Sequence, residues 1–260
     1  MRTIGSQGRL DPNDSDFVYS KVDRRYFFLD QPNLDLSEIY KRYATTFPGN
    51  IEVSEADFVK RIKQILTSLK ENSKESPILN GVYVPFIIPR SLANLDLGES
   101  VNQLLVLVGR NFALEFPDYE FNNFAESDLT EKIRVSTDSG LEDVYKKLEQ
   151  GDIVGVYFPT FFAGFAIKSQ RESMKSLPEK MKLSGALEIA CALIGSPNLL
   201  MKNGDNYPNG LVLAGVEPTN PDAQNYFWYF EAYGWNLNFN YRSMVGPASE
   251  YFAGGVSIVA

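Results

Sequence analysis

Histidine is absent from all 260 residues of the chain, and this absence excludes whole classes of chemistry. Without an imidazole there can be no Ser-His-Asp or Cys-His nucleophile system, and no side chain with an ordinary pKa near neutrality to transfer protons. Metal sites built on histidine are excluded as well. Acid–base chemistry in this chain would have to use carboxylates, lysine or tyrosine.

Cysteine is almost absent too, because Cys191 is the single example. Neither an intramolecular disulfide nor a cysteine cluster for zinc or iron–sulfur can form, so we expect no metal site and no cofactor. The absence of disulfides is typical of a reducing compartment. The stretch from Met1 to Asp16 lacks the apolar core of a signal peptide. These features predict a cytoplasmic protein.

Long apolar runs are few, and none predicts a membrane span. The uncharged run from Ile153 to Ile167 would reach only about 22 Å as a helix, short of the roughly 30 Å of a bilayer core. Pro159 interrupts it, and its β-branched and aromatic residues favour a strand. The second run, from Leu183 to Met201, contains Glu188. We expect both runs to be buried in a soluble fold, without membrane contact.

Positive charge is in deficit. The chain has 25 Lys and Arg against 33 Asp and Glu, a net charge of −8. An acidic surface repels phosphate backbones, so we expect no nucleic-acid partner. Short basic clusters near Lys21 and Lys60 are offset by neighbouring acids.

What is present is the composition of a globular protein, with 44% hydrophobic and 22% charged residues. Helical and strand patterns are mixed without strict alternation. We predict an α+β fold with a mixed or antiparallel sheet, packed helices and one central apolar helix near residues 184–194; an α/β fold is the alternative. Residues 1–16 are predicted to be a loose polar segment and 17–260 a single α+β domain, with two subdomains split near 117–128 as the alternative.

Periodicity and turn signals predict the individual elements. Helices are expected at 37–47, 54–72, 96–116, 139–150, 184–194 and 221–233. The stretch 96–116 also fits a buried strand, which is the alternative there. Strands are expected at 25–29, 78–88, 133–136, 211–216, 235–242 and 256–260, and in the run from Ile153, which could form two strands joined near Pro159. The segment 169–182 should be exposed, and 202–210 should be a turn.

Three glutamates, Glu188, Glu217 and Glu231, are candidates for acid–base catalysis. Glu188 lies in an apolar helical stretch, where a buried carboxylate needs a partner or a raised pKa. Glu217 follows a predicted buried strand, and Glu231 lies nearby in sequence. Glycosidases work with paired carboxylates and need no histidine. A hydrolase-like enzyme acting on a neutral substrate such as a sugar is therefore the alternative function.

An aromatic belt between Tyr226 and Trp235 precedes a strongly alternating stretch. Leu237, Phe239 and Tyr241 should form its inner face. Aromatic rings beside amides suit sugars, other flat ligands and protein interfaces. The predicted binding residues are Trp235, Asn236, Asn238, Asn240 and Arg242.

Taken together, these patterns favour a soluble, non-catalytic module over an enzyme. It would bind a protein partner or a small-molecule ligand through this C-terminal aromatic and asparagine surface. A structural subunit of an assembly is the third hypothesis, and the sequence leaves the oligomeric state open.

Overall fold

Side-chain caps mark where the longer helices begin. The computed structural model describes residues 2–18, 29–125, 128–201, 204, 206–223, 225–243 and 251–260. In it, Asp35, Ser54 and Asp96 each accept a hydrogen bond from a backbone N–H of the first helical turn. The α-helices are α1 (Leu36–Thr46), α2 (Glu55–Glu71), α3 (Leu97–Glu115), α4 (Leu141–Leu148), α5 (Ile167–Met174) and α6 (Ala186–Gly195). No helix within the described ranges is long and apolar enough to cross a membrane.

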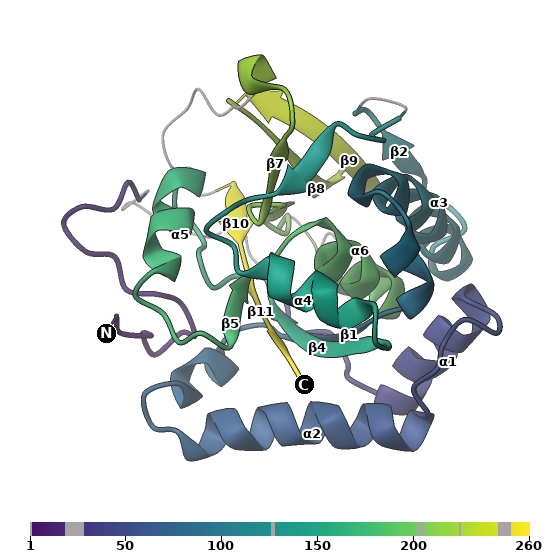
Figure 1. Cartoon of the computed structure of the whole chain (residues 1–260), viewed down its shortest axis with the longest axis horizontal. Helices are drawn as coiled ribbons and strands as arrows, with labels where there is room; N and C mark the ends of the chain where they lie inside the picture. The colour runs from purple at the N-terminus through teal and green to yellow at the C-terminus, as the bar shows by residue number, and fades with distance from the viewer. Residues whose placement is uncertain are drawn as a thin grey trace.

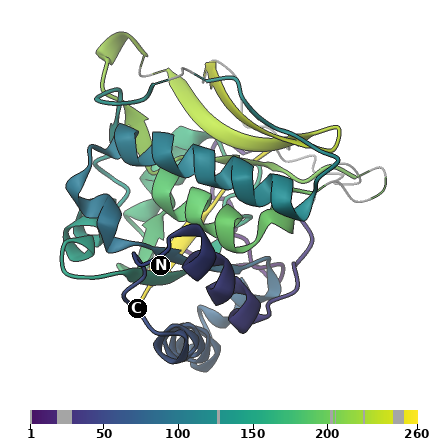
Figure 2. The same ribbon diagram turned by 90° about the vertical axis from the view of Figure 1, so that its right-hand side faces the viewer.

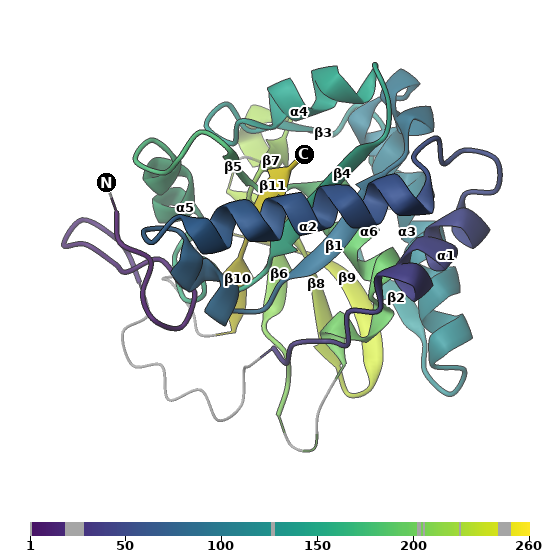
Figure 3. The same ribbon diagram turned by 90° about the horizontal axis from the view of Figure 1, so that it is seen from below.

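Four antiparallel strands form the first sheet, in the order β1 (Val84–Ile88), β4 (Ile153–Phe158), β11 (Val256–Val259) and β5 (Met181–Leu183). β1 is an edge strand, which is the place where a sheet tolerates Pro85. Helix α2 packs against β4 and passes across this sheet in Figure 3. β1 also contacts α6.

The second sheet is mixed and has five strands. Its order is β10 (Phe252–Gly254), β6 (Gly210–Val212), β8 (Tyr226–Tyr233), β9 (Asn236–Ser243) and β2 (Phe121–Asn123). The outer pairs β10–β6 and β2–β9 are parallel, and the inner pairs are antiparallel. A separate pair joins β3 (Ile133–Val135) to β7 (Val216–Pro218). The predicted α+β fold is confirmed (Figure 1).

Helix α6 lies at the centre, as predicted for the apolar stretch near 184–194. Every one of its residues is buried. It packs against α3, α1 and β1. In Figure 2 the layers run from the β8–β9 hairpin at the top, through α3 and α6, to α2 seen end-on at the bottom. The sheet with β8 and β9 and the outer helix α2 are therefore on opposite sides of the molecule.

The helix predicted at 221–233 is wrong. This stretch forms a short 3₁₀ turn, Pro221–Ala223, followed by strand β8. Six successive residues of β8 are buried, so the polar–apolar alternation that identifies a strand is missing. Gly234, the residue after this stretch, has φ +63° in the two-residue turn that joins β8 to β9.

Other segments also differ from expectation. Residues 169–182 include α5 and β5, and Ser169, Gln170 and Ser173 are buried. After Pro159 the chain makes turns rather than a second strand. The strand expected at 25–29 and part of the turn at 202–210 lie outside the described residues.

The segment before residue 17 makes specific contacts with the rest of the chain. Ile4 and Leu10 are buried, and the Leu10 N–H donates to the Phe161 carbonyl at 2.9 Å. Arg2 forms an ion pair with Asp16 and also donates to the Ser173 hydroxyl. The division of the chain into domains stays a prediction.

Candidate functional site

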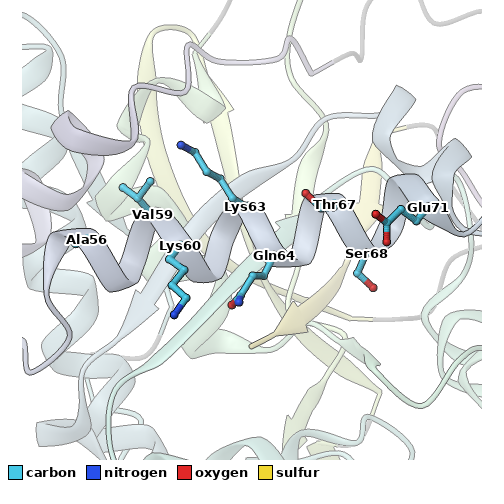
Figure 4. Close-up of a pocket in the computed structure, with 8 residues that line it drawn as sticks. All are labelled: Ala56, Val59, Lys60, Lys63, Gln64, Thr67, Ser68 and Glu71. Carbon is cyan, nitrogen blue, oxygen red and sulfur yellow. The ribbon is translucent and has the colours of Figure 1, made fainter.

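The surface hollows differ in the number of helices and strands that contribute lining residues. One of about 540 Å³ lies along α2, and all of its lining residues belong to that helix. Figure 4 shows the side chains of Lys60, Lys63 and Gln64 pointing outward, with no second element facing them. This face is the solvated side of an amphipathic helix and not a site where groups converge.

A groove of about 350 Å³ on the five-stranded sheet is built from several elements. Its volume falls in the range of about 300–1,000 Å³ typical of small-molecule sites. We call it the polar groove. Its lining residues come from β2, β8, β9 and the positions next to them: Asn122, Phe124, Glu231, Tyr233, Asn236, Asn238 and Asn240.

Strand register brings these side chains together. Asn238 pairs with Glu231 of β8 on one side and with Asn122 of β2 on the other. Because side chains alternate along a strand, Asn236, Asn238 and Asn240 share one face of β9. Leu237 and Phe239 point to the opposite face and are buried. The alternation predicted for β9 is thus present and creates the floor of the groove.

Hydrogen bonds fix the amide side chains. Asn240 Nδ2 donates to Glu231 Oε1, and the Tyr251 hydroxyl donates to Glu231 Oε2. Asn122 Nδ2 donates to Asn238 Oδ1 at 3.2 Å, and Asn236 Oδ1 accepts the Glu120 N–H at 2.9 Å.

These bonds leave amide groups available to a ligand. In the part of the chain that the structure describes, no hydrogen bond uses Asn122 Oδ1, Asn236 Nδ2 or Asn240 Oδ1. The groove therefore presents both acceptors and a donor in fixed positions.

Glu231 is the buried acid of the groove. Desolvation by burial raises the pKa of its carboxyl group, opposed by hydrogen bonds from Asn240 and Asn238 and by the positive charge of Arg242. Both carboxyl oxygens already accept a hydrogen bond. These partners hold Glu231 in one orientation.

Two exposed aromatic rings stand at the two ends of the groove. Tyr233, 73% exposed, pairs with Asn236 at the hairpin turn. Phe124, 64% exposed, comes just after β2, and its N–H donates to the Phe239 carbonyl, next to Asn240. Asn240 is four residue steps along β9 from Asn236, about 13 Å at 3.3 Å per step.

Comparisons of the chain with protein-family models, with curated proteins and with solved structures gave no match. The candidate site therefore rests on its own geometry and chemistry. Among the residues that the structure describes, no group of three or more cysteine, aspartate or glutamate side chains could hold a metal ion.

The structure places the predicted binding residues as follows. Asn236, Asn238 and Asn240 line the polar groove, although Asn238 is buried rather than exposed. Trp235 and Arg242 are not lining residues, although Trp235 precedes Asn236 in the chain and Arg242 is two residues beyond Asn240. The Trp235 ring, 42% exposed, stacks on Tyr119 at 5.6 Å, and the Arg242 guanidinium lies 5.9 Å from the centre of the Phe252 ring.

Sequence reasoning missed Asn122, Phe124 and Tyr233. The first two lie in the segment 117–128, where the alternative division into two subdomains falls, and Tyr233 lies in the predicted helix. The signal for Tyr233 was the pair of strand-like runs around Gly234, since two runs joined by two residues that include glycine are typical of a hairpin.

The three candidate glutamates are held in separate environments. Glu217 is bracketed by Arg134 at 2.9 Å and Arg171 at 3.2 Å. Glu188 is fully buried and accepts the Gly185 N–H at 3.0 Å and the Tyr145 hydroxyl at 3.2 Å. No hydrogen bond among the described residues joins any two of Glu188, Glu217 and Glu231. Each of the three therefore has its own hydrogen-bond or ion-pair partners among the described residues.

Proposed function

We propose that the protein is a non-catalytic binding module whose polar groove holds a small, uncharged ligand that carries hydrogen-bonding groups. The observation that carries this proposal is the set of ordered amide side chains around one bonded glutamate. Fixed amides with unused donors and acceptors recognise polar groups without a large ordering cost. Trp235, next to Asn236 in the chain, and Arg242, two residues after Asn240, are proposed to contact larger ligands.

The charge of the lining supports an uncharged ligand. Glu231 is the one carboxylic or basic side chain among the described lining residues. It would repel an anion, as would the net charge of −8. A cation would have to compete with the hydrogen bonds that Asn240 and Tyr251 already give to this carboxyl group.

The arrangement of acids supports binding without catalysis. Glycoside hydrolysis needs two carboxyl groups on either side of the scissile bond. The described lining of the groove supplies only Glu231, while Glu188 and Glu217 are bonded elsewhere. We also propose a cytoplasmic location, on the basis of the single Cys191.

The proposal is tested by titrating ¹⁵N-labelled protein with a panel of small probes and following the side-chain amide signals of Asn122, Asn236 and Asn240. The panel contains uncharged sugars, polyols and amides, and also phosphate and ethylamine. We expect uncharged probes at millimolar concentration to shift these signals, and the charged probes to leave them unchanged. Phe124→Ala should weaken the response.

Phe17→Ala is the matched control, because Phe17 is a similarly exposed aromatic (69%) in the N-terminal segment. This variant should respond as the wild type does. Shifts caused only by phosphate or ethylamine would contradict the uncharged ligand. If no uncharged probe moves the three amide signals, the groove is not the binding site.

A further inference from the structure

We infer that the ligand of the polar groove is a linear oligosaccharide, lying along β9 with one sugar ring against Tyr233 and another near Phe124. This inference rests on the proposed function and narrows its ligand to one chemical class.

The spacing of the aromatic rings points to an elongated ligand. Tyr233 and Phe124 mark the Asn236 and Asn240 ends of the groove, about 13 Å apart along the strand. A single sugar ring is too short to reach both. A chain of linked sugar rings presents flat apolar faces at intervals, and exposed aromatic rings offer complementary apolar surfaces.

The hydrogen-bonding groups between the two aromatic rings are complementary to the hydroxyl groups of a sugar. Within the described lining, Asn122 Oδ1 and Asn240 Oδ1 are unused acceptors, and Asn236 Nδ2 is an unused donor. A hydroxyl can donate and accept at once, so neighbouring hydroxyls on a sugar ring satisfy such a mixed set. Leaving these groups unpaired under a purely apolar ligand would cost binding free energy.

The position of the groove argues against an extended peptide. Peptides commonly bind sheets by adding a strand to an edge, where backbone N–H and C=O groups are open. The groove instead lies on the face of the sheet and is centred on β9, whose backbone is paired with β8 on one side and with β2 on the other. Recognition has to come from side chains on the sheet face.

The decisive experiment compares the binding affinities of sugars of different length. The full chain is titrated by calorimetry with linear glucan, xylan, mannan and chitin fragments of three sugar units, each beside its monosaccharide. We expect at least one trisaccharide to bind about tenfold or more tightly than its own monosaccharide. Tyr233→Ala and Phe124→Ala should each weaken that binding about three- to tenfold, while Phe17→Ala leaves it unchanged.

The outcomes separate this inference from the function on which it rests. The groove amides could respond to uncharged probes while no trisaccharide binds more tightly than its monosaccharide. In that case the oligosaccharide assignment is wrong and the proposed binding function is retained. The oligosaccharide assignment is also wrong, and the proposed binding function is retained, if the uncharged peptide N-acetyl-Gly-Asn-Gly amide binds the groove more tightly than any sugar. If trisaccharide binding is unaffected by both aromatic substitutions, the placement along β9 is wrong.

Discussion

Single residues show how the same side chain acquires different roles through its surroundings. Glu217 forms ion pairs with two arginines, and Glu231 accepts a hydrogen bond from Asn240 in the lining of the groove. Glu188 caps the first turn of α6 through the Gly185 N–H. Glu188 is the most constrained of the three. Desolvation raises the pKa of its carboxyl group to about 7, and its Oε1 has no hydrogen-bond partner among the described residues. A protonated carboxyl group is the form that burial favours.

Replacing Glu188 by glutamine should remove a pH dependence of stability. In the wild type the unfolded carboxyl ionises near pH 4.5 while the folded one stays protonated up to about pH 7. The free energy of unfolding should therefore fall as the pH rises from about 4.5 to 7, by roughly 3 kcal/mol in all. Glu188→Gln cannot ionise and should not show this loss. Urea unfolding at pH 5 and pH 8 measures the difference.

Glu142→Gln provides the control, because Glu142 is an exposed acid on α4. Its pH profile should follow that of the wild type. A Glu188→Gln profile that also follows the wild type would show that burial does not shift this group.

Elements differ in how far the sequence predicts them. Helices α1 and α2 could be predicted because their caps and their apolar stripes agree. β9 could be predicted because apolar residues on one face pack into the core while asparagines on the other face line the groove, which gives the sequence its alternation. β8 could not be predicted, because six successive residues are buried and its first five residues are all aromatic. A run of this kind does not distinguish a strand from a buried helix.

The candidate site could be predicted only in part. Asn236, Asn238 and Asn240 follow from the alternation of β9. Asn122 and Phe124 do not, because β2 has three residues and pairs with a strand more than a hundred positions away. No local pattern encodes such a pairing, which is fixed by tertiary packing.

Near its start, helix α3 packs so closely against the backbone of Leu129 that position 98 has no space for a side chain. A Cβ added at Gly98 would lie 1.7 Å from the carbonyl oxygen of Leu129. Gly98→Ala should therefore destabilise the protein by about 1–3 kcal/mol, although alanine favours helices over glycine by about 1 kcal/mol. Denaturant unfolding measures the change in the free energy of unfolding.

Val106→Ala is the control, because Val106 is an exposed residue of the same helix, and it should change stability by at most about 0.5 kcal/mol. Equal effects from the two substitutions would contradict the close approach.

The whole molecule is held together by contacts between segments far apart in sequence. Residues near the N-terminus reach Phe161 and Ser173, and β2 reaches β9. The groove depends on this organisation, since its lining comes from residues 122–124 and 231–240. Its shape is therefore a property of the assembled fold and not of one hairpin.

Leu10→Ala tests whether the N-terminal segment contributes to that assembly. Leu10 is 2% exposed, and truncating a buried leucine costs about 2–5 kcal/mol. We expect a loss in this range in thermal or denaturant unfolding. Thr3→Ala, at an exposed neighbouring position, should be near neutral. A neutral Leu10→Ala would instead support the loose segment predicted from composition.

The position of β11 has a consequence for how the chain is made. Residues 256–259 form an interior strand, between β4 and β5, although they come last of the four in sequence. During synthesis from the N-terminus, one side of β4 therefore stays without its hydrogen-bonding partner until these residues leave the ribosome. An open strand edge can pair with other chains. Protection of nascent chains against aggregation matters most in this interval, which ends when the last strand closes the gap.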